Sequence, residues 1–377
     1  MDNPIEDTAS MKKTCHKREI DMKNRDKNTQ TIHHPLFGIS LTNWFQILIK
    51  NGGIDTRYLP RAYFITISSL LTLPARLLFT VKYSKKIQKT PITQPPVFII
   101  GHWRSGTTYL HELLSYDPQF TYVTLWHTLL PNSFLILDPL KDLLAQFLPS
   151  ERPMDAIKVE ADGPYEEEAG IAVLNPWSFF HGLHFPRNAE EQYLKSMHFH
   201  NMTSQEKNHW KNTYHTFLQS VSYANKGKTL LLKNPPNTTR IQMLLELYPN
   251  ARFIHIYRNP YKVYLSTKKM RTRVLDKLAL QKTSSAELDT QIINNYIRVM
   301  NTFFDQKDII PKNQLVDIRY EDLVAEPEKQ VKQIYSTLNL PGLDNALPEM
   351  RKYLKKQENY KVNVYQIDEK IIQHVQK

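Results

Sequence analysis

Residues 96–110 read Pro-Val-Phe-Ile-Ile-Gly-His-Trp-Arg-Ser-Gly-Thr-Thr-Tyr-Leu. A short apolar run ends in a glycine-containing loop, and the loop opens a segment that is compatible with a helix. The N–H groups of such a loop and helix start point at a bound anion, and the helix dipole favours its charge. The stretch therefore predicts a site for a phosphate-like group.

The loop differs at one position from the P-loop of an NTPase. Such a P-loop has a lysine directly after its second glycine, where it reaches the β- and γ-phosphates. Here Thr107 follows Gly106, and the cation of the loop is Arg104. The loop thus fits a phosphate ester but lacks the lysine of an ATPase.

The composition is that of a globular, intracellular protein. The 377 residues are 41% hydrophobic and 23% charged, which argues against a disordered chain. The single cysteine, Cys15, excludes an internal disulfide framework and argues against an oxidising compartment. Residues 1–35 are polar and without the apolar core of a secretory signal. We therefore expect a cytoplasmic protein.

Positive charge is concentrated in residues 50–89, where eight Lys and Arg side chains accompany one acid, Asp55. Between the charges runs the apolar segment Ala62–Val81, interrupted by Pro74 and Arg76. A bilayer span needs about 20 apolar residues, and this segment barely reaches that length with a charge inside it. A membrane-surface helix, a pair of core helices and a span all remain open, and we expect peripheral attachment to an anionic membrane without a span.

Strands and helices alternate along the chain. This order predicts an α/β fold with a P-loop-like central parallel β-sheet flanked by helices, preceded by an N-terminal helical extension. The expected strands are Val97–Ile100, Thr229–Leu232 with Lys233 at its end, Arg252–Tyr257 and Gln314–Ile318. The expected helices are Phe37–Lys50, Ile241–Tyr248, one from Pro260 with Asn259 as its cap, one marked by Ile293–Phe304, and Pro327–Leu338.

The same patterns divide the chain into four parts. They are a disordered polar tail (1–35), a basic and apolar helical segment (36–90), the main domain (91–345) and a C-terminal extension (346–377). Ligands of parallel sheets bind beyond the C-terminal ends of the strands. Arg104, Lys233 and Arg258 each lie at or just after such an end.

Several of these segments together resemble the sulfotransferases that use 3′-phosphoadenylyl sulfate, and most closely a broad, mainly bacterial branch. The resemblance covers roughly residues 35–345 in the same order. It rests on the 101–108 loop, the Arg152–Asp155 and Asp162–Glu168 segments, Leu231–Pro236, Tyr257–Ser266 and Arg319–Leu323.

The resemblance implies the positions of the donor and of the catalytic lysine. The first loop would hold the 5′-phosphosulfate through Arg104, Ser105, Gly106, Thr107 and Thr108. Arg258 and Ser266 would hold the 3′-phosphate. Lys233 would neutralise charge on the leaving phosphate. This scheme requires no metal, and we expect none at the His181 and His184 pair.

Two departures from the family pattern concern the base and the substrate lid. The cytosolic branch has a base histidine at the position of Pro235, and residues 360–365 match the bacterial branch only loosely. The base must therefore come from elsewhere. The candidates are Glu166 and Glu168, with Asp162 and Glu167 nearby, in a segment where Pro164 predicts a helix start near Tyr165. We choose Glu166, keep Glu168 as the alternative, and would test His102 next.

The expected activity is transfer of a sulfuryl group to a hydroxyl or amine. The acceptor is a small molecule or lipid-like, the partner surface is an anionic membrane, and nucleic acid is not a partner. Two alternatives are a P-loop kinase or NTPase, and an inactive membrane-associated binding protein of the same fold. The sequence leaves the acceptor and the oligomeric state open.

Overall fold

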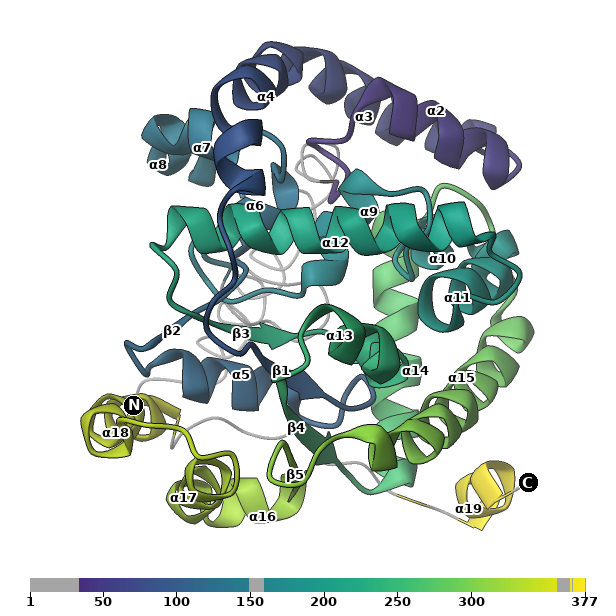
Figure 1. Ribbon diagram of the computed structural model, residues 1–377. Helices are drawn as coiled ribbons and strands as arrows, with labels where there is room; N and C mark the ends of the chain where they lie inside the picture. The colour runs from purple at the N-terminus through teal and green to yellow at the C-terminus, as the bar shows by residue number, and fades with distance from the viewer. Residues whose placement is uncertain (1–33, 149–158, 358–366, 368, 377) are drawn as a thin grey trace, which may run out of the picture.

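A computed structural model of the chain describes residues 34–148, 159–357, 367 and 369–376. At its centre lies a five-stranded parallel sheet with the order β2-β3-β1-β4-β5 (Figure 1). The strands are β1 (Val97–Ile100), β2 (Phe120–Thr121), β3 (Thr229–Lys233), β4 (Arg252–Tyr257) and β5 (Leu315–Arg319). The predicted α/β class with a central parallel sheet is confirmed.

Helices surround this sheet and make up most of the chain. The α-helices of the N-terminal half are α2 (Leu41–Lys50), α3 (Leu59–Leu71), α4 (Leu73–Gln88), α5 (Thr107–Ser115), α6 (Leu125–Leu129), α7 (Phe134–Leu137), α8 (Lys141–Ala145), α9 (Glu167–Leu174) and α10 (His181–His184). Those that follow are α11 (Ala189–His198), α12 (Ser204–Ala224), α13 (Ile241–Leu247), α14 (Pro260–Leu278), α15 (Ser285–Gln306), α16 (Tyr320–Ala325), α17 (Pro327–Thr337), α18 (Leu343–Gln357) and α19 (Glu369–Gln376). A 3-10 turn, η4 (Pro235–Thr239), follows β3 directly.

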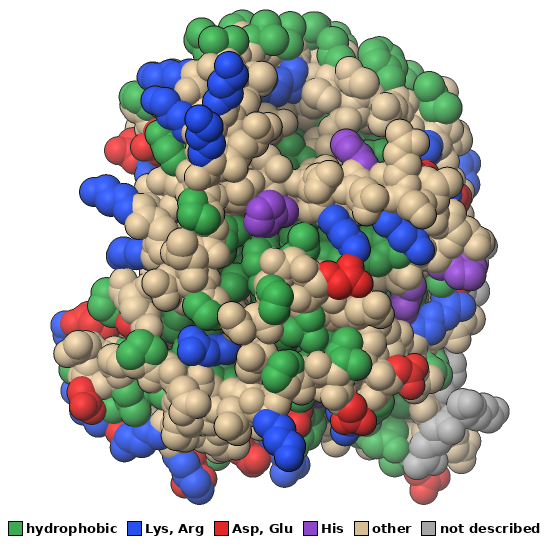
Figure 2. Space-filling view, viewed as in Figure 1, with side chains coloured by type: hydrophobic (Ala, Val, Ile, Leu, Met, Phe, Trp, Pro, Cys, Tyr) green, Lys and Arg blue, Asp and Glu red, His purple; other side chains and the backbone are tan. Residues whose placement is uncertain are grey.

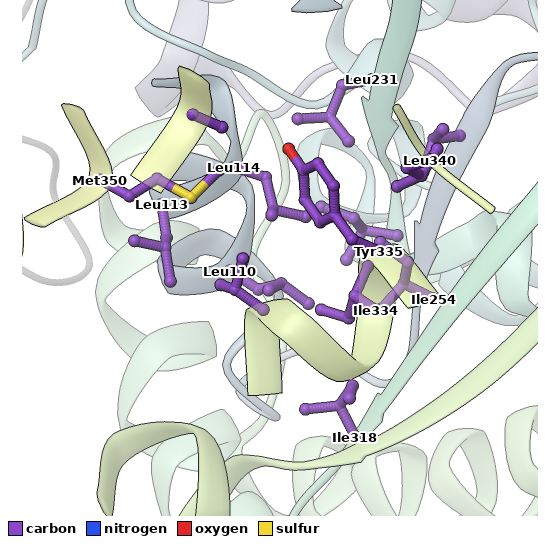
Figure 3. Close-up of a cluster of buried hydrophobic side chains, with 14 of the residues drawn as sticks. Leu110, Leu113, Leu114, Leu231, Ile254, Ile318, Ile334, Tyr335, Leu340 and Met350 are labelled. Carbon is purple, nitrogen blue, oxygen red and sulfur yellow. The ribbon is translucent and has the colours of Figure 1, made fainter. Parts of the chain in front are cut away.

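The inner strands β1, β3 and β4 are buried along nearly their whole length, whereas the edge strand β5 alternates between buried and exposed residues. All four residues of β1 are fully buried. On one face, Leu110, Leu113 and Leu114 of α5 pack with Ile334 and Tyr335 of α17 (Figure 3). On the other face, side chains from α12 and α13 form a second cluster. This two-sided packing fixes the β1–α5 loop at the C-terminal edge of the sheet.

The segment before the main domain forms the three helices α2, α3 and α4. They lie together at the edge of the molecule opposite to α16 and α17 (Figure 1). Packing begins before residue 36, because His34 is 5% exposed and its Nε2 lies 3.2 Å from the carbonyl oxygen of Leu278. The rest of the expected N-terminal tail, residues 1–33, lies outside the described residues.

Within the described part of the chain, no single helix is long and apolar enough to cross a membrane. The segments Thr56–Leu71 and Leu73–Gln88, bent by 43° at their junction, pass the same test of length and composition when taken as a pair.

The sequence analysis did not predict α11 and α12, and it expected α2 to begin at Phe37 instead of Leu41. Two further differences lie closer to the site. The short strand β2 was not expected, because two residues are too few to give a pattern. The helix expected to start near Tyr165 begins at Glu167, with Glu166 as its extended N-cap. The two-residue shift places Glu166 outside the helix and the two following glutamates inside it.

Candidate active site

The predicted anion loop joins β1 to α5, and two glycines give it its shape. Gly101 has φ of +142°, and a Cβ there would lie 2.2 Å from the carbonyl oxygen of Ile256. Gly106 has φ of +104°, and a Cβ there would lie 2.2 Å from the ring of Tyr320. Thr238 holds the start of the loop, since its Oγ1 accepts a hydrogen bond from the N–H of Gly101 at 2.8 Å. No other residue type fits at either glycine.

The loop ends in the N-terminus of α5, which begins at Thr107 with Gly106 as its left-handed cap. The side chain of Ser105 is buried, and its Oγ has no hydrogen-bond partner among the described residues. Buried hydroxyls are normally hydrogen-bonded, so an unpartnered one beside a helix N-terminus is available to donate to a bound anion.

The second predicted phosphate site contacts the first, although 154 residues separate Arg104 from Arg258. The Nε of Arg104 donates a hydrogen bond to Ser266 Oγ at 2.9 Å. The Nη1 of Arg258 donates to the carbonyl oxygen of Arg104 at 3.2 Å. Its guanidinium carbon lies 4.3 Å from the centre of the Tyr320 ring, and its Nε is buried without a hydrogen-bond partner in the described part of the structure. The structure thus brings the two sites together.

The C-terminal end of β3 carries Lys233, and its side chain is 3% exposed. The Nζ of Lys233 lies 2.6 Å from Glu166 Oε1 and 3.4 Å from Thr108 Oγ1. Glu166 is itself partly exposed, at 17% of its side chain. The structure therefore places the predicted lysine between the anion loop and the predicted base.

The three consecutive glutamates have three different surroundings. Glu167 is fully buried, where Tyr214 donates a hydrogen bond to its Oε1 at 3.0 Å. Burial raises the pKa of Glu167 to about 7. Glu168 is also fully buried, and its Oε2 lies 2.8 Å from Nη1 of the equally buried Arg240. Burial opposes its charge, but the Arg240 guanidinium holds the pKa of Glu168 below its ordinary value.

A pocket opens beside the Lys233–Glu166 pair. It encloses about 1110 Å³ of empty space, including its opening to solvent. Its polar end is lined by His102, Arg104, Thr107, Thr108, Glu166 and Lys233. The remainder is mainly apolar and includes Trp103 and Phe179, whose rings stack with centroids 4.2 Å apart. Glu167, Glu168, Arg258 and Ser266 are not among the lining residues.

The histidines near the loop are neutral. Burial lowers the pKa of His102 to about 4 and that of His111 to about 3. His102 lines the pocket, and its Nδ1 lies 2.8 Å from the carbonyl oxygen of Trp103. His181 and His184 are buried, and among the described residues no group of three or more His, Cys, Asp or Glu side chains could hold a metal ion.

Some predicted residues lie outside the described ones, and some important residues were not predicted. Arg152, Asp155 and residues 360–365 belong to the first group. Arg240, Tyr214 and Asn237 belong to the second: they hold the buried glutamates in place. The run of polar residues Asn237–Arg240 directly after Pro-Pro was a signal for Asn237 and Arg240 in the sequence, whereas Tyr214 lies in another segment and had none.

Comparisons with known proteins agree with this geometry. The matching family model is described as the sulfotransferase family and covers residues 95–345. The chain is 31% identical over 331 residues to omega-hydroxy-beta-dihydromenaquinone-9 sulfotransferase Stf3 of Mycobacterium bovis and of Mycobacterium tuberculosis, covering 88% of this chain and 85% of each relative.

Two crystal structures share the fold. Sulfotransferase STF1 from Mycobacterium tuberculosis gives a TM-score of 0.65 at 18% identity, over 88% of this chain and 90% of that chain. Sulfotransferase STF9 from Mycobacterium avium gives 0.64 at 16% identity, over 87% and 91%. At these identities the likeness concerns the fold.

Proposed function

We propose that this chain, which belongs to the sulfotransferase family, transfers the sulfuryl group of 3′-phosphoadenylyl sulfate to a hydroxyl group of a lipid-like acceptor. The family establishes sulfuryl transfer as the reaction, and the donor and the acceptor are inferred from the site. The single observation that carries the proposal is the contact of Lys233 with both Glu166 and Thr108 at the polar end of an apolar pocket.

The donor fits the residues that surround the anion loop. Ser105 Oγ and Arg258 Nε are buried polar atoms without hydrogen-bond partners among the described residues, and both can donate to phosphate oxygens. The N-terminus of α5 adds backbone N–H groups on the same side. Arg258 and Ser266 would take the 3′-phosphate, and residues 104–108 the 5′-phosphosulfate.

The residues at the polar end divide the chemistry between them. When bound, the donor supplies an activated sulfuryl group, and its transfer leaves negative charge on a phosphate oxygen. The ammonium of Lys233 is placed to neutralise that charge as it develops. The carboxylate of Glu166 accepts the proton of the attacking hydroxyl. Before the acceptor enters, the Lys233 ammonium and the Glu166 carboxylate form an ion pair.

Glu168 has a different role in this proposal. Its carboxylate accepts hydrogen bonds from Arg240, the N–H of Phe179 and Asn234, and it does not line the pocket. We assign it to holding α9 in place, so that Glu166 at the N-cap faces the pocket. Glu167 is likewise buried outside the pocket.

The acceptor is proposed to be lipid-like because most of the pocket wall is apolar. Trp103, Phe179 and Phe180 contribute aromatic surface, and Leu183, Val274 and Leu278 contribute aliphatic surface. The Stf3 relatives, whose names specify a hydroxylated menaquinone derivative, are consistent with this class of acceptor. The alternatives are less well supported. Thr107 stands where an NTPase needs lysine, and the presence of Arg104, Lys233, Arg258 and Ser266 argues against an inactive protein.

We also propose that α3 and α4 dock the protein on the cytoplasmic face of an anionic membrane. The outward side of these helices, which we call the α3–α4 apolar face, consists of Leu59, Tyr63, Leu70, Leu71, Leu73, Leu77, Leu78 and Val81, all exposed. Figure 2 shows hydrophobic side chains along the top of the molecule, where α3 and α4 lie, with a group of Lys and Arg side chains beside them. Lys82, Lys85, Lys86 and Lys89 are exposed near the end of α4.

The side chain of Arg76, which interrupts the apolar run in the sequence, points away from the α3–α4 apolar face. Arg76 is 8% exposed, and its guanidinium donates to the carbonyl oxygens of Gly38, Ile39 and Ser69. The same helices bury Ile65 and Phe79 against the protein. One side of the pair is therefore anchored to the domain, and the other can enter the headgroup region of a bilayer without crossing it.

Vesicle flotation tests the docking proposal. The full chain should float with vesicles that contain phosphatidylglycerol, less so at high salt and less so with phosphatidylcholine alone, because each lysine contributes about 1 kcal/mol near an anionic surface. The double variant Leu77→Asp/Val81→Asp should stay at the bottom, whereas the control Val324→Asp, at an exposed position of α16, should float. Failure of the wild-type chain to float under any condition would contradict docking.

Product analysis tests the transfer itself. Radiolabelled 3′-phosphoadenylyl sulfate is incubated with the full chain and a hydroxyl-containing lipid extract, and labelled products are identified by mass spectrometry. We expect label in a sulfated lipid, and none with Lys233→Ala. Label that appears only in water-soluble acceptors would contradict the lipid-like acceptor but leave the donor assignment in place.

A further inference from the structure

The apolar wall of the pocket contains a group of polar side chains that the proposed chemistry does not use. Thr267 and Arg271 lie one turn apart on α14, and Asn295 lies on α15. All three line the pocket and are nearly buried, at 4%, 6% and 6% exposure. We call these residues the Arg271 cluster.

Arg271 is a buried cation without a carboxylate partner among the described residues. Its Nη1 donates one long hydrogen bond, 3.4 Å, to Gln291 Oε1, and its guanidinium carbon lies 5.9 Å from the centre of the Phe179 ring. Burial lowers its pKa to about 10, so it remains charged at neutral pH. A buried charge without a counter-ion is costly, and such a charge calls for an anionic ligand.

The neighbours of Arg271 are unsatisfied as well. Thr267 Oγ1 and Asn295 Oδ1 are buried and have no hydrogen-bond partner in the described part of the structure. Buried polar atoms are normally paired, so two unpaired ones on the wall of one cavity indicate a ligand group that is polar at this point. The Thr267 hydroxyl and the Arg271 guanidinium can donate hydrogen bonds to an anion, whereas Asn295 Oδ1 accepts one and fits a donor group of the same ligand, such as a hydroxyl.

Arg271 lies further along α14 than Ser266, the residue of this helix that contacts the anion loop. The Thr267, Arg271, Val274 and Leu278 side chains form the pocket-lining face of α14. At about 1.5 Å rise per residue, Arg271 lies roughly 7 Å along the helix from Ser266, which contacts the anion loop. A group held by Arg271 would therefore lie further along α14 than a phosphate held by Ser266.

We propose that the Arg271 cluster binds an oxyanion of the acceptor, such as a carboxylate, so that the acceptor class is an apolar hydroxy acid. This inference deepens the proposed function and rests on it, because the proposed function makes this pocket the acceptor site. The predicted recognition is the usual one for arginine, in which a guanidinium donates two charge-assisted hydrogen bonds to a carboxylate. The apolar residues that line the same pocket would hold the hydrocarbon body.

A pair of simple probes tests the oxyanion site. Octanoate and octan-1-ol have the same chain length and differ in charge. Calorimetric titration of the full chain, with adenosine 3′,5′-bisphosphate bound, should give an affinity for octanoate that is about 10- to 100-fold higher than for octan-1-ol. Arg271→Gln should remove this preference and leave the affinity for octan-1-ol unchanged.

The control is Arg273→Gln, because Arg273 is an exposed arginine of the same helix. It should keep the preference for octanoate. Equal affinities for both probes in the wild-type chain would overturn the oxyanion site, as would an unchanged preference in Arg271→Gln. If Arg271→Gln does not fold, Thr267→Val provides the second test, with an expected loss of about two- to tenfold for octanoate alone.

The same samples separate this inference from the proposed function. The titration with adenosine 3′,5′-bisphosphate is run first. Absence of binding would contradict the donor assignment. The comparison of octanoate with octan-1-ol, repeated without the bisphosphate, would then still test the Arg271 cluster. Bisphosphate binding without any preference for octanoate would overturn the cluster proposal and leave the sulfuryl donor in place.

Discussion

The ammonium of Lys233, at the end of β3, lies 2.6 Å from the carboxylate of Glu166, at the N-cap of α9. The two residues are 67 positions apart in the chain, and both line the pocket beside the anion loop. In the absence of an acceptor each neutralises the other. The proposed reaction draws on both charges at once, the ammonium for the leaving group and the carboxylate for the proton.

Lys233→Ala should reduce turnover far more than it reduces affinity for adenosine 3′,5′-bisphosphate. The lysine acts on charge that develops only in the transition state. We expect a loss in kcat of at least about 100-fold, with bisphosphate affinity changed by less than about tenfold. The measurement pairs steady-state kinetics with calorimetry. Equal losses in both would make Lys233 a simple binding residue.

Glu166→Gln should reduce turnover, whereas Glu168→Gln should reduce the stability of the fold. Removal of a general base typically costs about 10²–10⁴ in rate, so Glu166→Gln should fold and bind the bisphosphate but turn over slowly. Glu168→Gln leaves Arg240 buried without its counter-ion, which should cost about 3–5 kcal/mol of stability. Thermal denaturation and kinetics of both variants are compared. Near-normal turnover in Glu166→Gln would direct the search for the base to His102.

Arg258→Ala and Ser266→Ala should weaken binding through the 3′-phosphate. Loss of a charge-assisted contact should cost about 1.5–3 kcal/mol. The affinity for adenosine 3′,5′-bisphosphate should therefore fall, whereas that for adenosine 5′-phosphate should change little. Since Ser266 also accepts the hydrogen bond from Arg104, the double variant should show less than the sum of the two losses. A parallel loss for both nucleotides would contradict the assignment of this pair.

Glu167 should make the fold less stable as the pH rises. Burial raises its pKa in the folded state to about 7, above the ordinary value of 4.5, so the fold prefers the protonated form. The stabilisation is complete below about pH 4.5 and is lost as the pH rises to about 7, a change on the order of 3 kcal/mol. Chemical denaturation at several pH values should show this loss in the wild-type chain but not in Glu167→Gln. Identical pH profiles would show that the carboxyl is not buried in this way.

The sequence predicted the elements whose cause is local. Val97–Ile100 and Arg252–Tyr257 form strands with the expected bounds, because each is a short run rich in β-branched and aromatic residues that ends at a loop. Asn259 caps α14 as expected, since its Oδ1 accepts from the N–H groups of Tyr261 and Lys262. The sequence placed Arg104, Lys233 and Arg258 at the ends of strands, and the C-terminal ends of parallel strands lie at one edge of a sheet.

The sequence could not separate the three glutamates, because their partners come from distant segments. Arg240 and Tyr214 approach α9 only through the tertiary fold, and these contacts make Glu167 and Glu168 buried groups while Glu166 faces the pocket. Arg76 was misleading for the same reason. In the sequence it interrupts an apolar run, whereas in the structure backbone carbonyl oxygens hold it beneath the helices.

The most direct test of the account is a titration of the full chain with adenosine 3′,5′-bisphosphate, without metal, against ATP with Mg²⁺. The anion loop lacks the lysine of an NTPase, and Arg258 and Ser266 form a second site on it for the 3′-phosphate. The account predicts that the bisphosphate binds without metal and at least about tenfold more tightly than ATP with Mg²⁺. Tighter binding of ATP with Mg²⁺, or no binding of the bisphosphate, would contradict it.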